Sequence, residues 1–184
     1  MIVFLDVDDV LANFCKAACE ILNVPYPPSK WRWYEDIPNG FERLNNACDI
    51  LFWKFLEWMP DGKEILAIVE SYFHPENIYL LTTPMPNSGS GTGKMLWVKK
   101  HIPQYYERLI ISTAPKHLLA RPDTLLIDDR GENVIEFRKA GGEAILVPRS
   151  WNNFCFSACF AVSAVGNRIK AISEEENAKS SCNR

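Results

Sequence analysis

The chain has 184 residues, of which 47% are hydrophobic, and its formal net charge at pH 7 is −3. This length and composition predict one domain with a full hydrophobic core and room for a small insertion. The acidic balance disfavours a nucleic-acid polymer or an anionic membrane as partner, because both favour a basic surface. The longest late apolar stretch, residues 154–165, is shorter than the roughly 20 residues that span a bilayer, so we expect a helix packed on the core.

The start of the chain and its cysteines indicate the cellular compartment. The opening apolar run is too short for a secretory signal and has no basic region before it. Six cysteines in a chain of this length do not suggest a disulfide framework. Cys15 and Cys19, like Cys155 and Cys159, are four residues apart, but no histidine stands at ligand spacing, which disfavours a zinc site. These features predict a protein of the reducing cytoplasm.

Apolar β-branched runs and amphipathic segments alternate along the chain, which predicts an α/β fold. Such alternation builds a parallel sheet that binds ligands at the carboxyl ends of its strands. In chain order we expect strand 2–5, helix 11–22, an aromatic loop with several prolines at 25–38, helix 41–58, a helix from a cap at Asp61 to about 72, strand 78–81, a flexible stretch at 86–93, helix 94–101, strand 109–111, strand 124–127, helix 132–140 and strand 144–147.

Two of these strands end in carboxylates. Asp6 and Asp8 follow the first strand, and Asp128 and Asp129 follow the strand over 124–127. Charge at the end of a buried strand must be hydrated, paired or bound to metal, and oxygen ligands suit a hard divalent cation. We therefore expect a shared Mg²⁺ site, at which one acid of the first pair attacks while the other serves as acid and then base. The plainer alternative is that these residues only cap turns.

Thr82, Thr83 and Lys116 are candidate phosphate ligands. The two threonines close the strand over 78–81, and hydroxyls and free backbone N–H groups at such a turn donate to phosphate oxygens. Thr-Thr-Pro is also an ordinary strand end. Lys116 follows the strand over 109–111 and would offset the negative charge of carboxylates and phosphate, although alone it would suggest a surface lysine.

The glycine-rich run over residues 88–94 is similar to a phosphate-binding P-loop but departs from that pattern. Ser88 and Met95 stand where the pattern needs glycine and a serine or threonine, and the spacing from the preceding strand is wrong. We therefore exclude a P-loop. Lys94, at the start of the next helix, still has the reach to contact a phosphate.

Taken in order, these motifs resemble those of the haloacid dehalogenase-like (HAD) phosphohydrolase superfamily. A narrower resemblance, to the 5′(3′)-deoxyribonucleotidase family and its bacterial and phage relatives, rests on residues 6–14, 81–84, 126–130 and 148–152. Asp9 departs from the glycine of many members and adds negative charge near the site. The resemblance implies a Rossmann-like parallel sheet with a small helical cap inserted after the first strand. The implied segments are a core of 1–14 and 76–173, a cap of 15–75 and a disordered tail of 174–184.

The resemblance also implies roles for single residues. Asp6 would be the nucleophile that forms an aspartyl-phosphate, and Asp8 the general acid and base. Thr82 and Lys116 would hold the phosphoryl group, while Mg²⁺ would bind Asp6, Asp8 through its backbone carbonyl, and the acidic pair. Which of Asp128 and Asp129 ligates the metal directly stays open.

Aromatic residues near the first motif are candidates for substrate binding. The resemblance places Phe14 against the nucleobase. Trp31 and Trp33 are expected to offer stacking faces in the cap, with packing in the cap core as an equal alternative.

The expected function is therefore a Mg²⁺-dependent phosphomonoesterase acting on nucleoside monophosphates, most simply 5′-deoxyribonucleotides. Two alternatives are a HAD-type phosphatase of sugar phosphates or another small metabolite, and a non-catalytic binding module on the same fold. The presence of both Asp6 and Asp8 disfavours the binding module. The expected partner is a small phosphomonoester, with no nucleic-acid polymer and no membrane, and a homodimer is left open.

Overall fold

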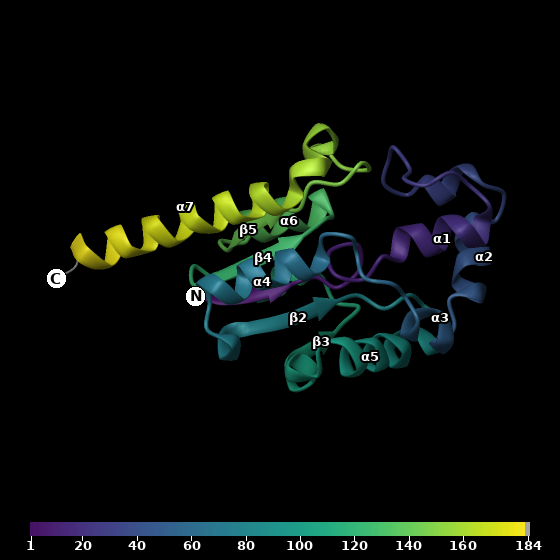
Figure 1. The fold of residues 1–184 in the computed structure, drawn as a ribbon, viewed down its shortest axis with the longest axis horizontal. Coiled ribbons are helices and arrows are strands. Elements are labelled where there is room, and N and C mark those ends of the chain that lie inside the picture. Colours follow the sequence, from purple (N-terminus) through teal and green to yellow (C-terminus); the bar gives the residue numbers. More distant parts are fainter. Residues whose placement is uncertain (183–184) are drawn as a thin grey trace.

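A computed structural model describes the backbone of residues 1–182 and the side chains of residues 1–175. It contains a five-stranded parallel sheet in the order β3-β2-β1-β4-β5, which confirms the expected α/β class (Figure 1). From the central strand β1 the chain first continues to β2 and β3 on one side and then crosses to β4 and β5 on the other. The order of the strands therefore reverses beside β1, and open α/β sheets bind ligands at such a point. The strands are β1 Ile2–Leu5, β2 Ile78–Thr82, β3 Leu109–Ile111, β4 Thr124–Asp128 and β5 Glu143–Leu146.

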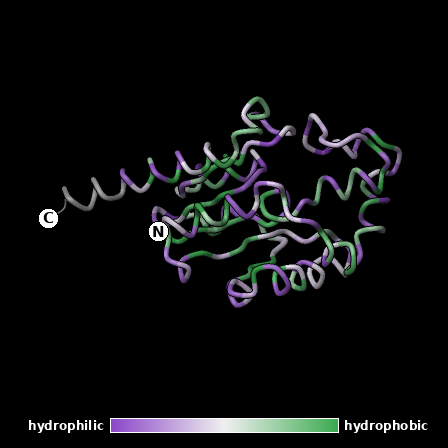
Figure 2. Tube along the Cα trace, in the orientation of Figure 1, coloured by the Kyte–Doolittle hydropathy of each residue, from purple (hydrophilic) through white to green (hydrophobic). Residues whose placement is uncertain are grey.

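The register of β1 against β4 decides where the acidic residues lie. Ile2 pairs with Thr124 and Leu5 pairs with Ile127, so both strands end at the same level of the sheet. Most residues of these strands are hydrophobic and buried on both faces, as expected for a parallel sheet (Figure 2). The residues that follow are acidic, so the carboxylates gather at one edge of an otherwise apolar layer.

Helices cover both faces of the sheet. α4 (Gly62–Tyr72), α5 (Gly89–His101) and α7 (Ala161–Cys182) contribute buried residues to the large cluster that contains Val3 and Leu5. α6 (Gly131–Lys139) packs on the other face, where Phe137 and Val134 meet Phe4 and Leu126.

The helical cap lies beyond the carboxyl ends of the strands (Figure 1). It comprises α1 (Phe14–Leu22), a 3₁₀ helix at Trp33–Asp36, α2 (Gly40–Ala47) and α3 (Ile50–Lys54). The single helix expected over 41–58 is two helices, because Asp49 interrupts it and accepts the N–H of Phe52 at 2.9 Å as the N-cap of α3. The cap expected over 15–75 also includes α4, which lies over the sheet in Figure 1 and packs against α7.

α5 begins at Gly89, so the flexible stretch expected over 86–93 is wrong for residues 89–93. Glycine composition suggested flexibility, but here it permits close packing of two helices. A Cβ at Gly93 would lie 2.5 Å from Cβ of Trp53 and 2.7 Å from the carbonyl oxygen of Ile50. A Cβ at Gly89 would lie 2.7 Å from the backbone nitrogen of Ile50. The glycines therefore let α5 of the core approach α3 of the cap.

The C-terminal segment combines a 3₁₀ helix at Cys155–Phe160 with α7. Ala161, Val165, Ile169 and Ile172 are buried, so the part from residue 161 packs on the core as expected. The backbone of 174–182, for which disorder was expected, continues α7, whereas residues 183 and 184 lie outside the described residues. Within the described part of the chain, no helix combines the length and hydrophobicity needed to cross a membrane.

Candidate active site

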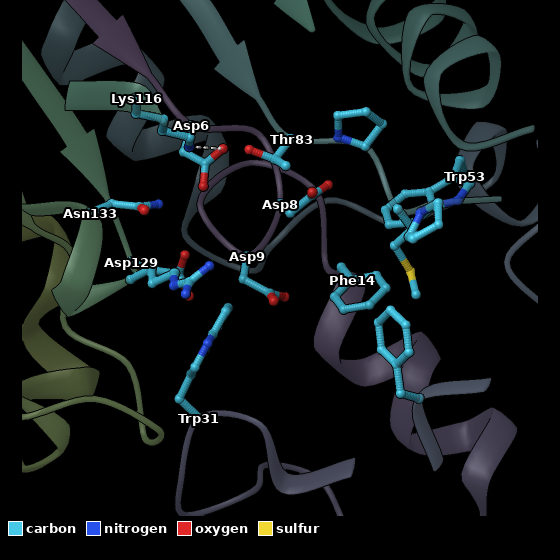
Figure 3. A pocket seen from close by; sticks show the side chains of 15 residues that line it. Asp6, Asp8, Asp9, Phe14, Trp31, Trp53, Thr83, Lys116, Asp129 and Asn133 are labelled. Atoms are coloured by element: carbon cyan, nitrogen blue, oxygen red, sulfur yellow. Dashed lines mark ion pairs between the residues drawn. The ribbon is translucent and has the colours of Figure 1, made fainter. Parts of the chain in front are cut away.

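Three carboxylates converge at the carboxyl ends of β1 and β4. Side-chain oxygens of Asp6, Asp128 and Asp129 lie within 4.8 Å of one another, and all three residues are buried. The structure thus brings together the two acidic motifs that the sequence placed on separate strands. In Figure 3 the side chain of Asp8 lies apart from Asp129, on the side of Asp6 that faces Phe14 and Trp53.

Lys116 supplies the positive charge next to the carboxylates. It begins a short 3₁₀ helix after Pro115, and its Nζ lies 2.8 Å from Oδ1 of Asp6 and 2.7 Å from Oδ2 of Asp128. Burial opposes the charge on this lysine, but the attraction of Asp128 and Asp6 outweighs burial and raises the pKa of Lys116. Asn133 of α6, which the sequence did not single out, donates to Oδ2 of Asp128 at 3.0 Å.

One lysine does not balance this concentration of acid. Burial raises the pKa of Asp6 well above its usual range, and Asp128 and Asp8 add to the rise against the opposing effect of Lys116. Burial and the neighbouring Asp9 and Asp128 likewise raise the pKa of Asp129. Three close oxygen ligands in a buried, electron-rich pocket are the donor set that a hard divalent cation binds. The residues present therefore fit a Mg²⁺ ion.

A second polar cluster lies at the end of β2. Nζ of Lys94 donates to Oγ1 of Thr82 at 2.9 Å and to Oδ2 of Asp8, and Thr82 Oγ1 donates to the same Asp8 oxygen at 3.3 Å. Thr82 and Lys94 are both buried. Their side chains thus bind Asp8, and it is the neighbouring Thr83 that lines the cavity in front of the carboxylates.

That cavity has a volume of about 260 Å³ and lies between the sheet edge and the cap (Figure 3). Phe14 and Trp31, both expected to contact the substrate, line this cavity. Trp33 does not line this cavity. It lines an adjoining apolar cavity of about 120 Å³ and packs against the cluster that contains Trp151. Arg130, which follows the acidic pair, also lines the cavity, and further lining residues that the sequence did not single out are Phe41, Trp53, Met85 and Asn133.

Arg149, which is distant in sequence, binds the loop after β1. Its Nε donates to the carbonyl oxygen of Asp9 at 2.7 Å, and its Nη1 and Nη2 donate to the Asp61 carboxylate at 2.6 and 3.0 Å. Asp9 has a left-handed backbone with φ of 57°, and its side chain accepts the N–H of Cys15 at 2.7 Å. Burial is the main cause that raises the pKa of Asp9 to about 8. The sequence did not predict these contacts of Arg149, because residues 148–152 stood out only through the family resemblance.

A parallel sheet with paired acids at the ends of β1 and β4 and a lysine between them is the arrangement expected of a HAD-type phosphomonoesterase. The family model described as "5′ nucleotidase, deoxy (pyrimidine), cytosolic type C protein (NT5C)" matches residues 1–164. The chain belongs to this family, which confirms the resemblance and favours an enzyme over the binding module.

Solved structures show a more distant likeness. A hydrolase from Pseudomonas syringae is 15% identical, covers 87% of this chain and 89% of its own, and has a TM-score of 0.48. A HAD family enzyme from Bacteroides thetaiotaomicron, solved with magnesium and inorganic phosphate, is 15% identical, covers 84% of this chain and 96% of its own, and has a TM-score of 0.42. No curated protein matches the chain.

Proposed function

We propose that the protein is a Mg²⁺-dependent phosphatase of nucleoside monophosphates, most simply 5′-deoxyribonucleotides, that works through an aspartyl-phosphate on Asp6. The observation that carries the proposal is that Asp6 and Asp8 line one cavity together with aromatic rings. Asp6 is grouped with Lys116 and the acidic pair, and Asp8 is paired with a second lysine, Lys94.

The first chemical step joins Asp6 to phosphorus. A carboxylate oxygen of Asp6 attacks the phosphorus, the bond from phosphorus to the ester oxygen breaks, and Asp8 gives that oxygen a proton. The ammonium of Lys116, 2.8 Å from Asp6, offsets the negative charge that gathers on the phosphoryl oxygens. Thr83 lines the cavity in front of Asp6, from where its hydroxyl can donate to a phosphoryl oxygen.

The second step releases phosphate. Asp8 takes a proton from a water molecule, whose oxygen attacks the phosphorus and frees the Asp6 carboxylate. Mg²⁺ held by Asp6, the backbone carbonyl of Asp8 and the acidic pair would neutralise the phosphate and the close carboxylates. We also propose a cytoplasmic location, since Cys15, Cys19 and Cys48 are free thiols in the described part of the chain.

The nucleotide preference rests on the cap. Phe14 and Trp31 present aromatic surface to the cavity that also holds the carboxylates, and an aromatic ring stacked on a base contributes about 1–3 kcal/mol. A sugar phosphate has no planar group to use this surface. The aromatic lining therefore favours a nucleotide over the sugar-phosphate alternative.

A phosphatase screen of purified protein over nucleoside monophosphates and sugar phosphates, with Mg²⁺ and with EDTA, tests this proposal. We expect hydrolysis of nucleotides that EDTA stops and Mg²⁺ restores. Asp6→Asn should lose turnover while the fold persists, because the amide cannot attack and also relieves repulsion among the acids. Preference for sugar phosphates would contradict the substrate, and Asp6→Asn activity within tenfold of wild type would contradict the aspartyl-phosphate.

A further inference from the structure

The two carboxylates that follow β4 have different hydrogen-bond partners. In Asp128 both oxygens already accept hydrogen bonds. Its Oδ1 accepts the backbone N–H of Arg130 at 2.8 Å. Its Oδ2 accepts from Nζ of Lys116 at 2.7 Å and from Nδ2 of Asn133 at 3.0 Å. The carboxylate of Asp128 is therefore committed to neighbouring side chains and backbone, which is not the case for Asp129.

The Asp129 side chain accepts one hydrogen bond from the described residues. Nε1 of Trp151 donates to Oδ2 of Asp129 at 2.7 Å, and both residues are buried. Asp129 lines the cavity, and one of its oxygens lies within 4.8 Å of oxygens of Asp6 and Asp128. Its Oδ1 is thus the one oxygen of the acidic pair that no described residue occupies.

The indole of Trp151 is itself held in one orientation. Trp151 is 5% exposed and is buried in a cluster with Cys15 and Cys19 of α1, against which Trp33 packs. An indole N–H can only donate a hydrogen bond, so Trp151 cannot ligate a cation and acts only on the carboxylate that it contacts. The packing therefore gives the N–H a fixed direction toward Asp129.

The next residue fixes the backbone of Asp129. Nδ2 of Asn152 donates to the carbonyl oxygen of Asp129 at 2.9 Å and to that of Val147 at 2.8 Å. Val147 directly follows β5, so these two hydrogen bonds join the ends of β4 and β5. Consecutive residues after β5 thus hold both the main chain and the side chain of Asp129.

We propose that Trp151 is a positioning residue that fixes the Asp129 carboxylate for a divalent cation. Its hydrogen bond to Oδ2 keeps the carboxylate from rotating and leaves Oδ1 for the metal. Carboxylates that ligate metals commonly accept such hydrogen bonds, and loss of the donor typically weakens metal binding about 10–100-fold. This inference rests on the proposed function, in which the acidic pair binds Mg²⁺.

Isothermal titration calorimetry of the purified protein with Mg²⁺ alone, without substrate, tests this role. Trp151→Phe keeps an aromatic ring but removes the N–H, and we expect it to raise the Kd for Mg²⁺ by about 10–100-fold. Site-specific replacement of Trp151 by benzothienylalanine, which has the shape of tryptophan with sulfur in place of the N–H, should weaken binding in the same way while the packing is kept. Circular dichroism shows that each variant is folded at the temperature of the titration.

Trp97→Phe is the matched control. Trp97 is 1% exposed, and its Nε1 donates to the carbonyl oxygen of Leu56 at 2.8 Å, so this variant also loses a buried indole hydrogen bond, but none to a carboxylate. Its Kd for Mg²⁺ should equal that of the wild type. In kinetics with p-nitrophenyl phosphate, Trp151→Phe should need more Mg²⁺ for half-maximal activity, whereas its kcat at saturating Mg²⁺ should approach that of the wild type.

The possible outcomes separate this inference from the proposed function. An unchanged Kd in both Trp151 variants, or a change only in Trp151→Phe, would overturn the positioning role and leave the proposed phosphatase standing. A wild type that binds no Mg²⁺ would overturn both. A wild type that binds Mg²⁺ but hydrolyses no phosphomonoester would overturn the proposed function alone, because the titration contains no substrate.

Discussion

Replacing Arg149 with methionine should destabilise the protein and slow the reaction, although Arg149 lies outside the cavity. The side chain is 4% exposed and joins three segments that are distant in sequence. It binds the Asp61 carboxylate at the start of α4 through two nitrogens and the carbonyl oxygen of Asp9 through a third. Methionine fills similar space but makes none of these hydrogen bonds.

The magnitude follows from the burial of the pair. Removing one partner of a buried ion pair costs about 3–5 kcal/mol, because the other charge is left without compensation. The side chain of Asp61 is 21% exposed and regains part of its hydration, so we expect the lower end, about 3 kcal/mol. In a domain of this size, that corresponds to a fall in Tm of roughly 6–12 °C. Turnover should also fall, because Asp9 belongs to the loop that carries Asp6 and Asp8.

Urea denaturation followed by circular dichroism measures the free energy of unfolding. Arg168→Met is the matched control, since Arg168 and Glu143 form a looser pair at 3.7 Å with side chains 43% and 38% exposed, and its loss should cost less than about 1 kcal/mol. Adding Asp61→Asn to Arg149→Met should recover part of the loss by removing the stranded charge. A loss for Arg149→Met no larger than that of the control would refute the reasoning.

Three further predictions address the cavity, the helix contact and the metal. Phe14→Ala should lower kcat/KM by one to two decades for nucleotides but little for p-nitrophenyl phosphate, because stacking on the base contributes about 1–3 kcal/mol away from phosphorus. If steady-state kinetics instead show equal losses on both substrates, the role of Phe14 is to support Trp53, on which it stacks. Gly93→Ala should lower the free energy of unfolding in urea by about 1–3 kcal/mol, because its Cβ would lie 2.7 Å from a backbone oxygen. Gly91→Ala, whose Cβ would have its nearest contact at 3.9 Å, should raise the free energy of unfolding by roughly 0.5–1 kcal/mol. Similar values for the two variants would contradict the packing role of Gly93. Mg²⁺ at about 100 times its Kd should stabilise the fold by about 2.7 kcal/mol, seen as a rise in Tm that EDTA reverses; an unchanged Tm would count against a metal at the carboxylates.

The sheet and the acidic edge were readable from the sequence because each depends on short segments. An apolar run followed at once by Asp6 or Asp128 is a local pattern, and the parallel arrangement then brings the ends together. The contacts that complete the site are long-range. Lys94 lies 86 residues from Asp8, and Arg149 lies 140 residues from Asp9. Nothing local distinguishes these side chains from surface lysines and arginines.

Two errors in the predicted helices have the same origin. The glycine run before Lys94 was interpreted as flexible because composition does not reveal a neighbouring helix, whereas contact with Ile50 and Trp53 orders it. One long helix was predicted over 41–58 because the pattern of apolar and polar residues continues without a break past Asp49. Local propensity did not show that the chain bends there to place Trp53 against α5.

The close contact of α3 with α5 also makes the two walls of the cavity unlike. The wall that contains Trp53 is packed tightly on the core, because α3 and α5 approach so closely at Gly93 that no side chain would fit between them. The opposite wall is different. Residues 23–39, all of them described, include no buried residue, and Trp31 in this segment meets the core through its contact with Arg130 at 5.6 Å. The Trp31 segment is therefore the more exposed of the two walls of the cavity.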